Sequence, residues 1–182
     1  LLASFHSRKK KIVDVFTHCH SSTVTAILTK APVRVRNTET RPLSQGRITA
    51  RELAAAGVPV VHHVDSAMIE ALREADLALI GADAVTREGV YNKIGSELLG
   101  LLADHYRIPL YVCCSFWKFD QRPVVIEQRP PGEVWSTSLR HVSIHNPAFE
   151  CVHLRHVRGV VCEDGILSPG AFLQRAQKVL PR

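Results

Sequence analysis

An open α/β fold with a mostly parallel sheet is the fold class that this sequence predicts. Two observations support it. Short apolar runs alternate along the chain with amphipathic helical segments, which is the pattern of parallel βαβ units. Polar residues also gather directly after these runs, where open α/β sheets bind their ligands.

The composition fits one soluble globular domain and limits its partners. Of 182 residues, 46% are hydrophobic and 22% are charged, with a net charge of +6. That charge favours anionic partners. Aromatic residues make up only 6%, and no arginine–aromatic alternation occurs, so a nucleic-acid partner is not expected. A small phosphorylated ligand explains the positive charge as well as a nucleic acid would. The basic run Ser7–Lys11 is expected to be a solvated turn.

Cysteine usage and hydropathy indicate the compartment. The five cysteines include no C-x-x-C pair, so neither a disulfide framework nor a zinc site is indicated. No apolar run is long enough to cross a bilayer, and the start of the sequence lacks the apolar core of a signal peptide. We therefore expect a reduced, cytoplasmic protein without membrane contact, metal or cofactor.

The first half of the chain supplies three strands, each followed by a helix. Apolar runs followed by caps and glycine or alanine stops set the boundaries. The alternation in the second run, Val33–Arg36, indicates a strand near a sheet edge. We expect strands at Ile12–Phe16, Val33–Arg36 and Val58–Val64, and helices at 23–29, 47–56 and 67–75.

Cys19 lies after the first strand and just before a helix that Ser21 or Ser22 can cap. This environment lowers the pKa of a thiol and makes the thiolate available. The alternative is a small buried cysteine packed under the helix. It is the commoner fate of a free cysteine, and the local pattern alone favours it.

The loop after the second strand carries Glu39, Arg41 and Gln45. Loops beyond strand ends are where functional side chains concentrate. Arg41 suits bidentate binding of a phosphate or a sugar. The alternative is a structural ion pair between Arg41 and Glu39, and the two roles are compatible.

Asp83 follows the buried strand Leu77–Ile80, where a reacting group could meet it. A hairpin tip is expected at Arg87-Glu-Gly89, and Asn92-Lys-Ile-Gly95 then leads into a helix from Ser96 to Tyr106. The start of that helix and Lys93 predict an anion pocket beside the carboxylate. The alternatives are a turn-forming Asp83 and a solvated Lys93.

The second half continues the alternation. Lys118, among aromatic residues beyond the strand Pro109–Cys114, either packs its stem or contacts a phosphate. Residues 121–139 are irregular, a turn is expected at 146–149, a last strand at 157–162, and a helix from Ser168-Pro169. Since Cys19, the Arg41–Gln45 loop, Asp83, Lys93 and Lys118 all follow predicted strands, we expect them to converge on one edge of the sheet.

Several short motifs together resemble one family. It contains ribose-1,5-bisphosphate isomerase, methylthioribose-1-phosphate isomerase and the regulatory subunits of translation initiation factor 2B. The resemblance covers nearly the whole chain. Within this family, the chain looks most similar to the archaeal-type ribose-1,5-bisphosphate isomerase. In order, the motifs are Thr17-His-Cys-His-Ser21, Thr38-Glu-Thr-Arg-Pro42 with Gln45-Gly46, Val64-Asp-Ser-Ala67, Gly81-Ala-Asp83, Asn92-Lys-Ile-Gly95 and Asn146-Pro-Ala-Phe149.

This resemblance implies a Rossmann-like, three-layer α/β/α domain like that of ribose-5-phosphate isomerase and CoA-transferase relatives. It implies that Cys19 and Asp83 are the catalytic pair. It further implies that Asn92, Lys93 and Lys118 hold substrate and phosphate and that Gln45 contacts the sugar. The expected reaction is aldose–ketose isomerisation of ribose 1,5-bisphosphate to ribulose 1,5-bisphosphate by acid–base chemistry.

Two alternatives remain open at this point. One is a non-catalytic, sugar-phosphate-sensing subunit of the initiation-factor type, whose members commonly lack the cysteine and the aspartate. The other is methylthioribose-1-phosphate isomerase. Family members carry a helical domain with an Arg-Gly phosphate-binding motif ahead of the part matched here, and nothing like it precedes Leu1. We therefore expect residues 1–182 to be a single catalytic domain, with that helical domain absent or truncated, and a homo-oligomer, either a dimer or a hexamer.

Overall fold

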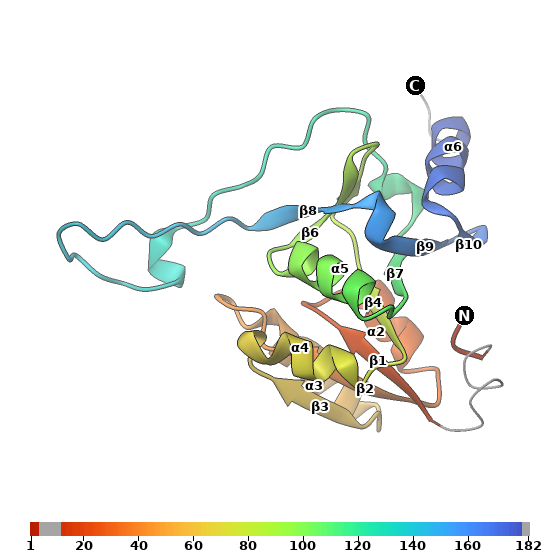
Figure 1. The fold of residues 1–182 in the computed structure, drawn as a ribbon, viewed down its shortest axis with the longest axis horizontal. Coiled ribbons are helices and arrows are strands. Elements are labelled where there is room, and N and C mark those ends of the chain that lie inside the picture. Colours follow the sequence, from red (N-terminus) through yellow and green to blue (C-terminus); the bar gives the residue numbers. More distant parts are fainter. Residues whose placement is uncertain (4–11, 180–182) are drawn as a thin grey trace.

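The main sheet has seven strands, and all neighbouring pairs are parallel except β10 with β9. A computed structural model describes residues 1–3 and 12–179, so the basic turn predicted at residues 7–11 lies outside the described residues. The strand order is β10-β9-β7-β4-β1-β2-β3 (Figure 1). The bounds are β1 (Val13–Thr17), β2 (Val33–Thr38), β3 (Val60–His63), β4 (Leu77–Ile80), β7 (Leu110–Cys113), β9 (Val157–Cys162) and β10 (Gly165–Leu167).

Helices cover both faces of this sheet, which confirms the predicted α/β/α layering. Strand β4 shows why: Leu77 and Leu79 pack into one apolar cluster, while Ala78 and Ile80 pack into the other. A strand buried on both faces is apolar throughout. Helices α2 (Ser22–Leu28) and α3 (Gln45–Ala55) cover one face, and α4 (Met68–Arg73), α5 (Ser96–His105) and α6 (Pro169–Val179) the other.

Strand β2 lies next to the edge strand β3, which agrees with its predicted place near an edge, although it is not itself an edge strand. It lies between β1 and β3, and the edges are β3 and β10. The alternating arginines that indicated an edge both pair with a carboxylate on the neighbouring strand, although Arg34 is exposed and only Arg36 is buried. Arg34 Nε donates to Asp14 Oδ1 at 2.6 Å and Arg36 Nε donates to the same oxygen at 3.3 Å. Charge pairing with the adjacent strand explains the alternation, because each guanidinium has its counter-charge on β1.

A second, antiparallel sheet joins β5 (Ala84–Val85), β6 (Gly89–Lys93) and β8 (Phe149–His153). The turn between β5 and β6 confirms the predicted hairpin tip. Strand β8 was not predicted, because Asn146-Pro indicated only a turn there. Asn92 and Lys93 consequently lie inside a strand, paired with Glu150 and Phe149, and not in a loop leading into a helix.

Residues 121–148, here called the arm, leave the body beyond β7 and return to β8 (Figure 1). The base of the arm is tied by polar contacts: Arg129 Nη2 donates to Glu133 Oε1 at 2.6 Å, and Asn146 Nδ2 donates to the Pro130 carbonyl at 3.0 Å. The arm also exposes apolar side chains: Val125, Ile126, Val134, Trp135, Leu139 and Val142.

The described part of the chain also contains four short 3-10 turns: η1 (Asp65–Ala67), η2 (Phe116–Lys118), η3 (Pro131–Glu133) and η4 (Leu154–His156). The first two follow the carboxyl ends of β3 and β7, and η4 precedes β9. In the described part of the chain, no helix combines the length and the apolar character that crossing a membrane requires.

Candidate active site at the carboxyl edge of the sheet

Four parallel strands deliver the predicted site residues to one edge. Cys19 follows β1, Arg41 and Gln45 follow β2, Asp83 follows β4, and Lys118 lies in η2 after β7. A pocket of about 590 Å³ opens there, lined by Asp83, Asn92 and Lys118 among others. The shared edge follows from the topology, because parallel strands end on the same side of a sheet.

The Cys19 thiol is buried, and its backbone is held in an unusual conformation. Its φ is 65°, in the left-handed region that residues with a side chain rarely adopt. Its N–H donates to Thr40 Oγ1 at 3.0 Å, and its carbonyl accepts from Thr49 Oγ1 at 2.9 Å. Such a conformation persists only where the surroundings enforce it, and these two threonines do so.

The expectation of a lowered thiol pKa at Cys19 is wrong. Burial is the largest influence and raises the pKa, and the charges of Asp83 and Asp65 raise it further. The backbone N–H of His20 and the charge of Lys93 act in the opposite direction. Desolvation outweighs the pKa-lowering effect of the helix start, because Cys19 is only 7% exposed and burial disfavours the thiolate.

The carboxyl of Asp83 lies within the electrostatic reach of Lys93, which also acts on Cys19. The Asp83 N–H donates to the Tyr91 carbonyl at 2.8 Å, which ties the residue to β6. Although the residue has surface open to the pocket, partial desolvation by the pocket walls raises the pKa of its carboxyl, and Lys118 and Lys93 oppose this rise. A carboxyl with a raised pKa exchanges protons more readily near neutral pH.

Lys93 is a buried charge in β6. It is 5% exposed, and its ammonium lies 6.0 Å from the centre of the Phe149 ring. Among the described residues it forms no ion pair or hydrogen bond, while its neighbour Asn92 donates to Ser96 Oγ at 2.9 Å. A buried ammonium without a direct ion-pair partner is costly, so this position favours an anionic ligand.

The anion pocket predicted at the start of α5 is already filled by the chain itself. Glu150 of β8 places its carboxylate there and accepts from the Glu97 N–H at 2.6 Å. The N–H groups of Gly95 and Ser96 also interact with it. The N–H groups that a phosphate would need are therefore occupied, and this part of the prediction is wrong.

Arg41 and Gln45 lie on the same edge but are not among the residues lining the 590 Å³ pocket, and neither are Cys19 and Lys93. Arg41 Nη2 donates to the Val134 carbonyl at the base of the arm, at 3.1 Å. Glu39 pairs with Arg47, so the alternative pairing of Arg41 with Glu39 is not formed. Within the described part of the chain, the buried Oε1 of Gln45 has no hydrogen-bond partner, which leaves an acceptor at this edge.

The polar network beneath Cys19 was not anticipated. The Asp65 carboxylate accepts from the N–H groups of Thr40 and Arg41, both at 2.7 Å, and Thr40 in turn holds Cys19. His18 bridges Thr38 Oγ1 and the Ile94 carbonyl, both at 2.8 Å, so its Nε2 carries the hydrogen. An aspartate directly after the third strand, within the motif Val64-Asp-Ser-Ala67, was the available signal.

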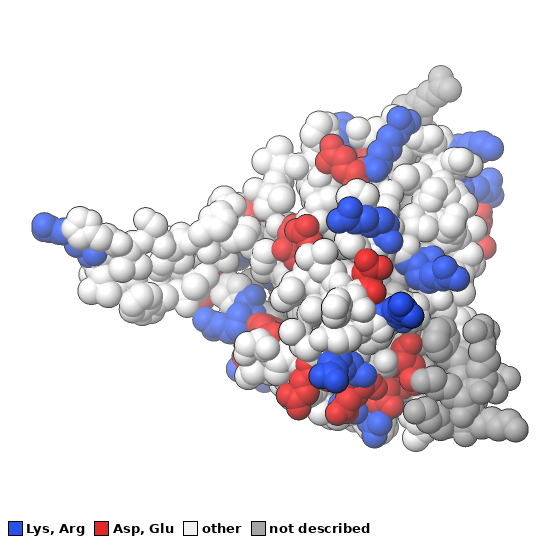
Figure 2. Space-filling view, viewed as in Figure 1, with Lys and Arg blue, Asp and Glu red and all other residues white. Residues whose placement is uncertain are grey.

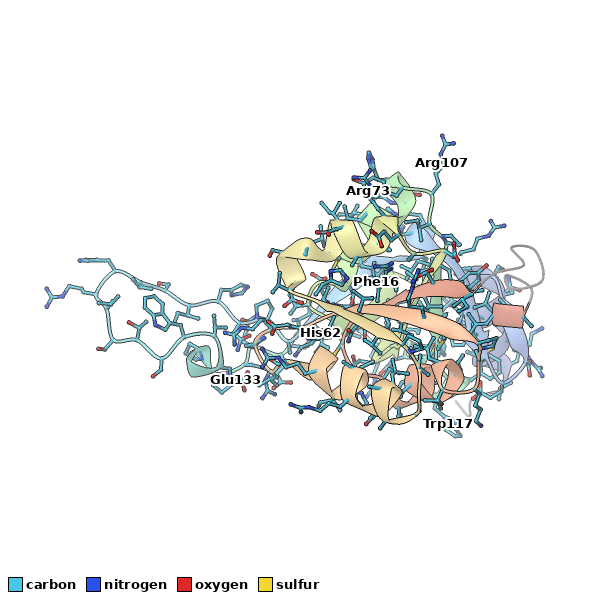
Figure 3. The ribbon with its side chains drawn as sticks, turned by 90° about the horizontal axis from the view of Figure 1, so that it is seen from below. Phe16, His62, Arg73, Arg107, Trp117 and Glu133 are labelled. Carbon is cyan, nitrogen blue, oxygen red and sulfur yellow. The ribbon has the colours of Figure 1, made fainter. Side chains whose placement is uncertain are left out.

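The arm reaches this edge as well. Glu133 lies where the arm meets the body (Figure 3). Its carboxylate, whose pKa is lowered chiefly by Arg129, is close enough to Lys93 to be influenced by its charge. Among the described residues, no three His, Cys, Asp or Glu side chains come together as a metal site. The thiol, the carboxyl and the lysines near this edge suit acid–base chemistry on an anionic ligand.

The fold and the site together define a doubly wound α/β protein with a polar pocket at the carboxyl edge of its sheet. The chain belongs to the initiation factor 2 subunit family, whose model matches residues 7–169. This confirms the family resemblance.

Individual relatives agree with that assignment. A ribose 1,5-bisphosphate isomerase of Thermococcus kodakarensis is 35% identical, over 90% of this chain and 57% of its own length. A putative methylthioribose-1-phosphate isomerase of Methanosphaera stadtmanae is 38% identical, over 72% of this chain and 46% of its own. The chain thus spans about half the length of the curated relatives it matches.

A solved structure shares the fold. The Pyrococcus horikoshii structure described as translation initiation factor eIF-2B superimposes with a TM-score of 0.77 at 32% identity, over 92% of this chain and 63% of that one. The predicted three-layer α/β fold is thereby confirmed.

Proposed function

We propose that this protein is an aldose–ketose isomerase that converts ribose 1,5-bisphosphate to ribulose 1,5-bisphosphate. The observation that carries the proposal is the coupling of a buried thiol and a carboxyl beside a buried, unpaired lysine. The charge of Asp83 acts on the Cys19 thiol, and the charge of Lys93 acts on both groups. The names of several relatives support the same reaction.

Ring opening is the first step of the proposed mechanism. The Asp83 carboxyl donates its proton to the ring oxygen as the bond from C1 to that oxygen breaks. The Cys19 thiolate removes the proton from C2, and the electrons of that C–H bond form a C1–C2 double bond. Since the charge of Asp83 raises the pKa of Cys19, a protonated Asp83 favours the thiolate that this step needs.

Ketone formation is the second step and restores both groups. The C2 hydroxyl gives its proton to the Asp83 carboxylate as the C2 carbonyl forms. The electrons of the double bond take the proton from the Cys19 thiol at C1. Each group thus gives and receives one proton, and the C1 phosphate stays attached throughout.

Substrate binding in this proposal uses the remaining predicted residues. Lys93 and Lys118 neutralise phosphate or developing negative charge, and Asn92 and Gln45 orient the sugar. The unpaired state of Lys93 and the free acceptor of Gln45 among the described residues support these roles. Arg41 is proposed to contact substrate only after releasing the Val134 carbonyl.

Residues 1–182 are proposed to act as the catalytic domain of this enzyme, in the cytoplasm. The five free cysteines support a reducing compartment.

A homo-oligomer is proposed because the arm exposes Val125 at 90% and Leu139 at 58%, which water solvates poorly. Light scattering after gel filtration tests this: Val125→Asp with Leu139→Asp should give monomers, whereas the control Leu98→Asp on α5 should not. A monomeric wild type at high concentration contradicts it.

Direct turnover tests the reaction. The protein is incubated separately with ribose 1,5-bisphosphate and methylthioribose 1-phosphate, and the products are identified by NMR. Ribulose 1,5-bisphosphate from the first substrate alone is the expected result. Turnover of the second substrate alone identifies the other isomerase.

A regulatory subunit of the initiation-factor type is the second candidate. It is favoured by solved relatives described as eIF-2B, at 32% and 28% identity. It predicts binding of a sugar phosphate without turnover, and a stable complex with other subunits. Binding without product in the NMR assay would therefore decide for it.

A further inference from the structure

A second cleft, of about 350 Å³, opens at the amino edge of the sheet. It lies between the end of α5 and the turn η4, just before β7 and β9 begin. Its floor is apolar, formed by Ala103, Ile108, Pro109 and Val157, and its polar lining is Arg107, Arg155, Arg158, His156 and Asp104.

Positive charge exceeds negative charge in this cleft. Three arginines face one carboxylate, and all three arginines are exposed. Within the described part of the chain, none of the three forms an ion pair with a carboxylate. Basic side chains gather on the face of the molecule that carries α5 (Figure 2), and Arg107 projects outward from that face (Figure 3).

The side chain of Arg155 is held by a hydrogen bond, and the backbone of Arg107 is fixed by a tight turn. The His156 side chain is only 5% exposed, and its Nε2 accepts from Arg155 Nε at 3.1 Å. Its Nδ1 therefore carries the hydrogen and faces Asp104 Oδ2 at 3.5 Å, which draws the one carboxylate toward the histidine. Arg107 has a φ of 57°, and the turn is closed by the Ile108 N–H, which donates to the Ala103 carbonyl at 2.8 Å.

We propose that this cleft binds the phosphate or diphosphate group of a small molecule, at a site separate from the one at the carboxyl edge. Guanidinium groups match phosphate oxygens in geometry and charge, and unpaired ones retain their donors for a ligand. The apolar floor accommodates the uncharged part of the ligand. Strand β7 separates the two sites, and its four residues span about 13 Å.

Binding of pyrophosphate and of inorganic phosphate to the full chain tests this proposal. Calorimetry at low salt gives the affinity, and amide NMR locates the contact. Hydrogen bonds to a charged group contribute enough that Arg155→Ala with Arg158→Ala should weaken pyrophosphate binding at least about tenfold. The control Arg51→Ala, an exposed arginine on α3, should leave the affinity unchanged.

The NMR shifts should fall on residues 103–109 and 154–158. Equal affinity in the double variant and the control overturns the proposal, and so do shifts confined to residues 81–83, 92–93 and 115–118. If the double variant does not fold, Arg158→Ala alone carries the test with the same expected loss. Absence of binding by both anions at millimolar concentration also overturns it.

Discussion

The two edges of the main sheet handle charge in different ways. At the carboxyl edge, Lys93 is buried without a direct ion-pair partner among the described residues, and Cys19 is fixed in a left-handed conformation by a chain of hydrogen bonds from Asp65. At the amino edge, Arg155 and Arg158 are exposed, and only a histidine steadies one of them.

This difference separates chemistry from simple recognition. Burying a charge and holding a strained backbone both cost stability, which a protein retains where reacting groups must be pre-organised. Exposed arginines cost little and can recognise an anion without altering its bonds. We therefore expect substitutions at the carboxyl edge to change turnover, and those at the amino edge to change only affinity.

The largest expected effect is on Cys19 and Asp83. Cys19→Ser and Asp83→Asn should each lower turnover of ribose 1,5-bisphosphate by about a hundred- to ten-thousandfold, because each removes one of the two proposed proton-transfer groups. Substrate affinity, measured by calorimetry, should change little. The controls Cys151→Ser and Asp164→Asn should keep near-wild-type rates. Near-wild-type turnover in both site variants would break the distinction between the edges.

Substitution of Lys93 sharpens the comparison, because we expect it to lower turnover while raising stability. Lys93→Met should lower turnover about ten- to hundredfold by removing a charge-assisted contact. It should also raise the free energy of unfolding by about 1 kcal/mol or more, because a buried, unpaired charge is lost. Thermal melts of Lys93→Met and of the exposed Lys118→Met test this, and only the first should melt higher. A lower melting temperature for Lys93→Met would show that its charge is compensated in the fold.

Asp65 tests whether the network beneath Cys19 tunes the thiol. In Asp65→Asn one acceptor for the Thr40 and Arg41 N–H groups is lost, and turnover should fall by about tenfold, a typical effect of losing one such bond. Because the charge of Asp65 helps raise the pKa of Cys19, alkylation of Cys19 should begin at lower pH in the variant. Mass spectrometry of the Cys19 peptide follows this. An unchanged pH profile would mean that Asp65 only shapes the loop.

The smallest expected effect is the contribution of His18 to the pH dependence of stability. Burial lowers its pKa from the ordinary 6.5, so below that pH the unfolded chain takes up a proton that the folded chain resists. The free energy of unfolding should therefore fall with decreasing pH, by at most about 1 kcal/mol between pH 7 and 5.5. Urea titrations of the wild type and of His18→Gln, which retains one donor and one acceptor, give the difference. Parallel pH curves for the two proteins would contradict it.

The sequence predicted the main sheet better than the site. Strand β4 was placed at its observed bounds because Leu77–Ile80 is apolar throughout, which only a doubly buried strand needs. Strand β8 was missed because its pattern is half polar and a turn signal precedes it. Without β8, neither the pairing of Lys93 nor the carboxylate of Glu150 at α5 could be inferred, since both depend on contacts distant in sequence.

The pKa of the Cys19 thiol is a second property that could not be predicted from the sequence. A helix start beside Cys19 is visible in the sequence, but the desolvation that outweighs it depends on how tightly surrounding segments close over the sulfur. Sequence motifs can indicate which groups meet. The protonation state in which they meet is a property of the packed structure.

The arm also has a consequence for how the molecule could be divided. Strands on its two flanks interleave: β8 pairs with β6, and β9 lies between β7 and β10. A single cut near residue 139 would leave two fragments that share both sheets, with no paired strand broken. Such fragments should remain associated or reassemble when mixed, which makes the arm tip a natural place for splitting the chain into complementing halves.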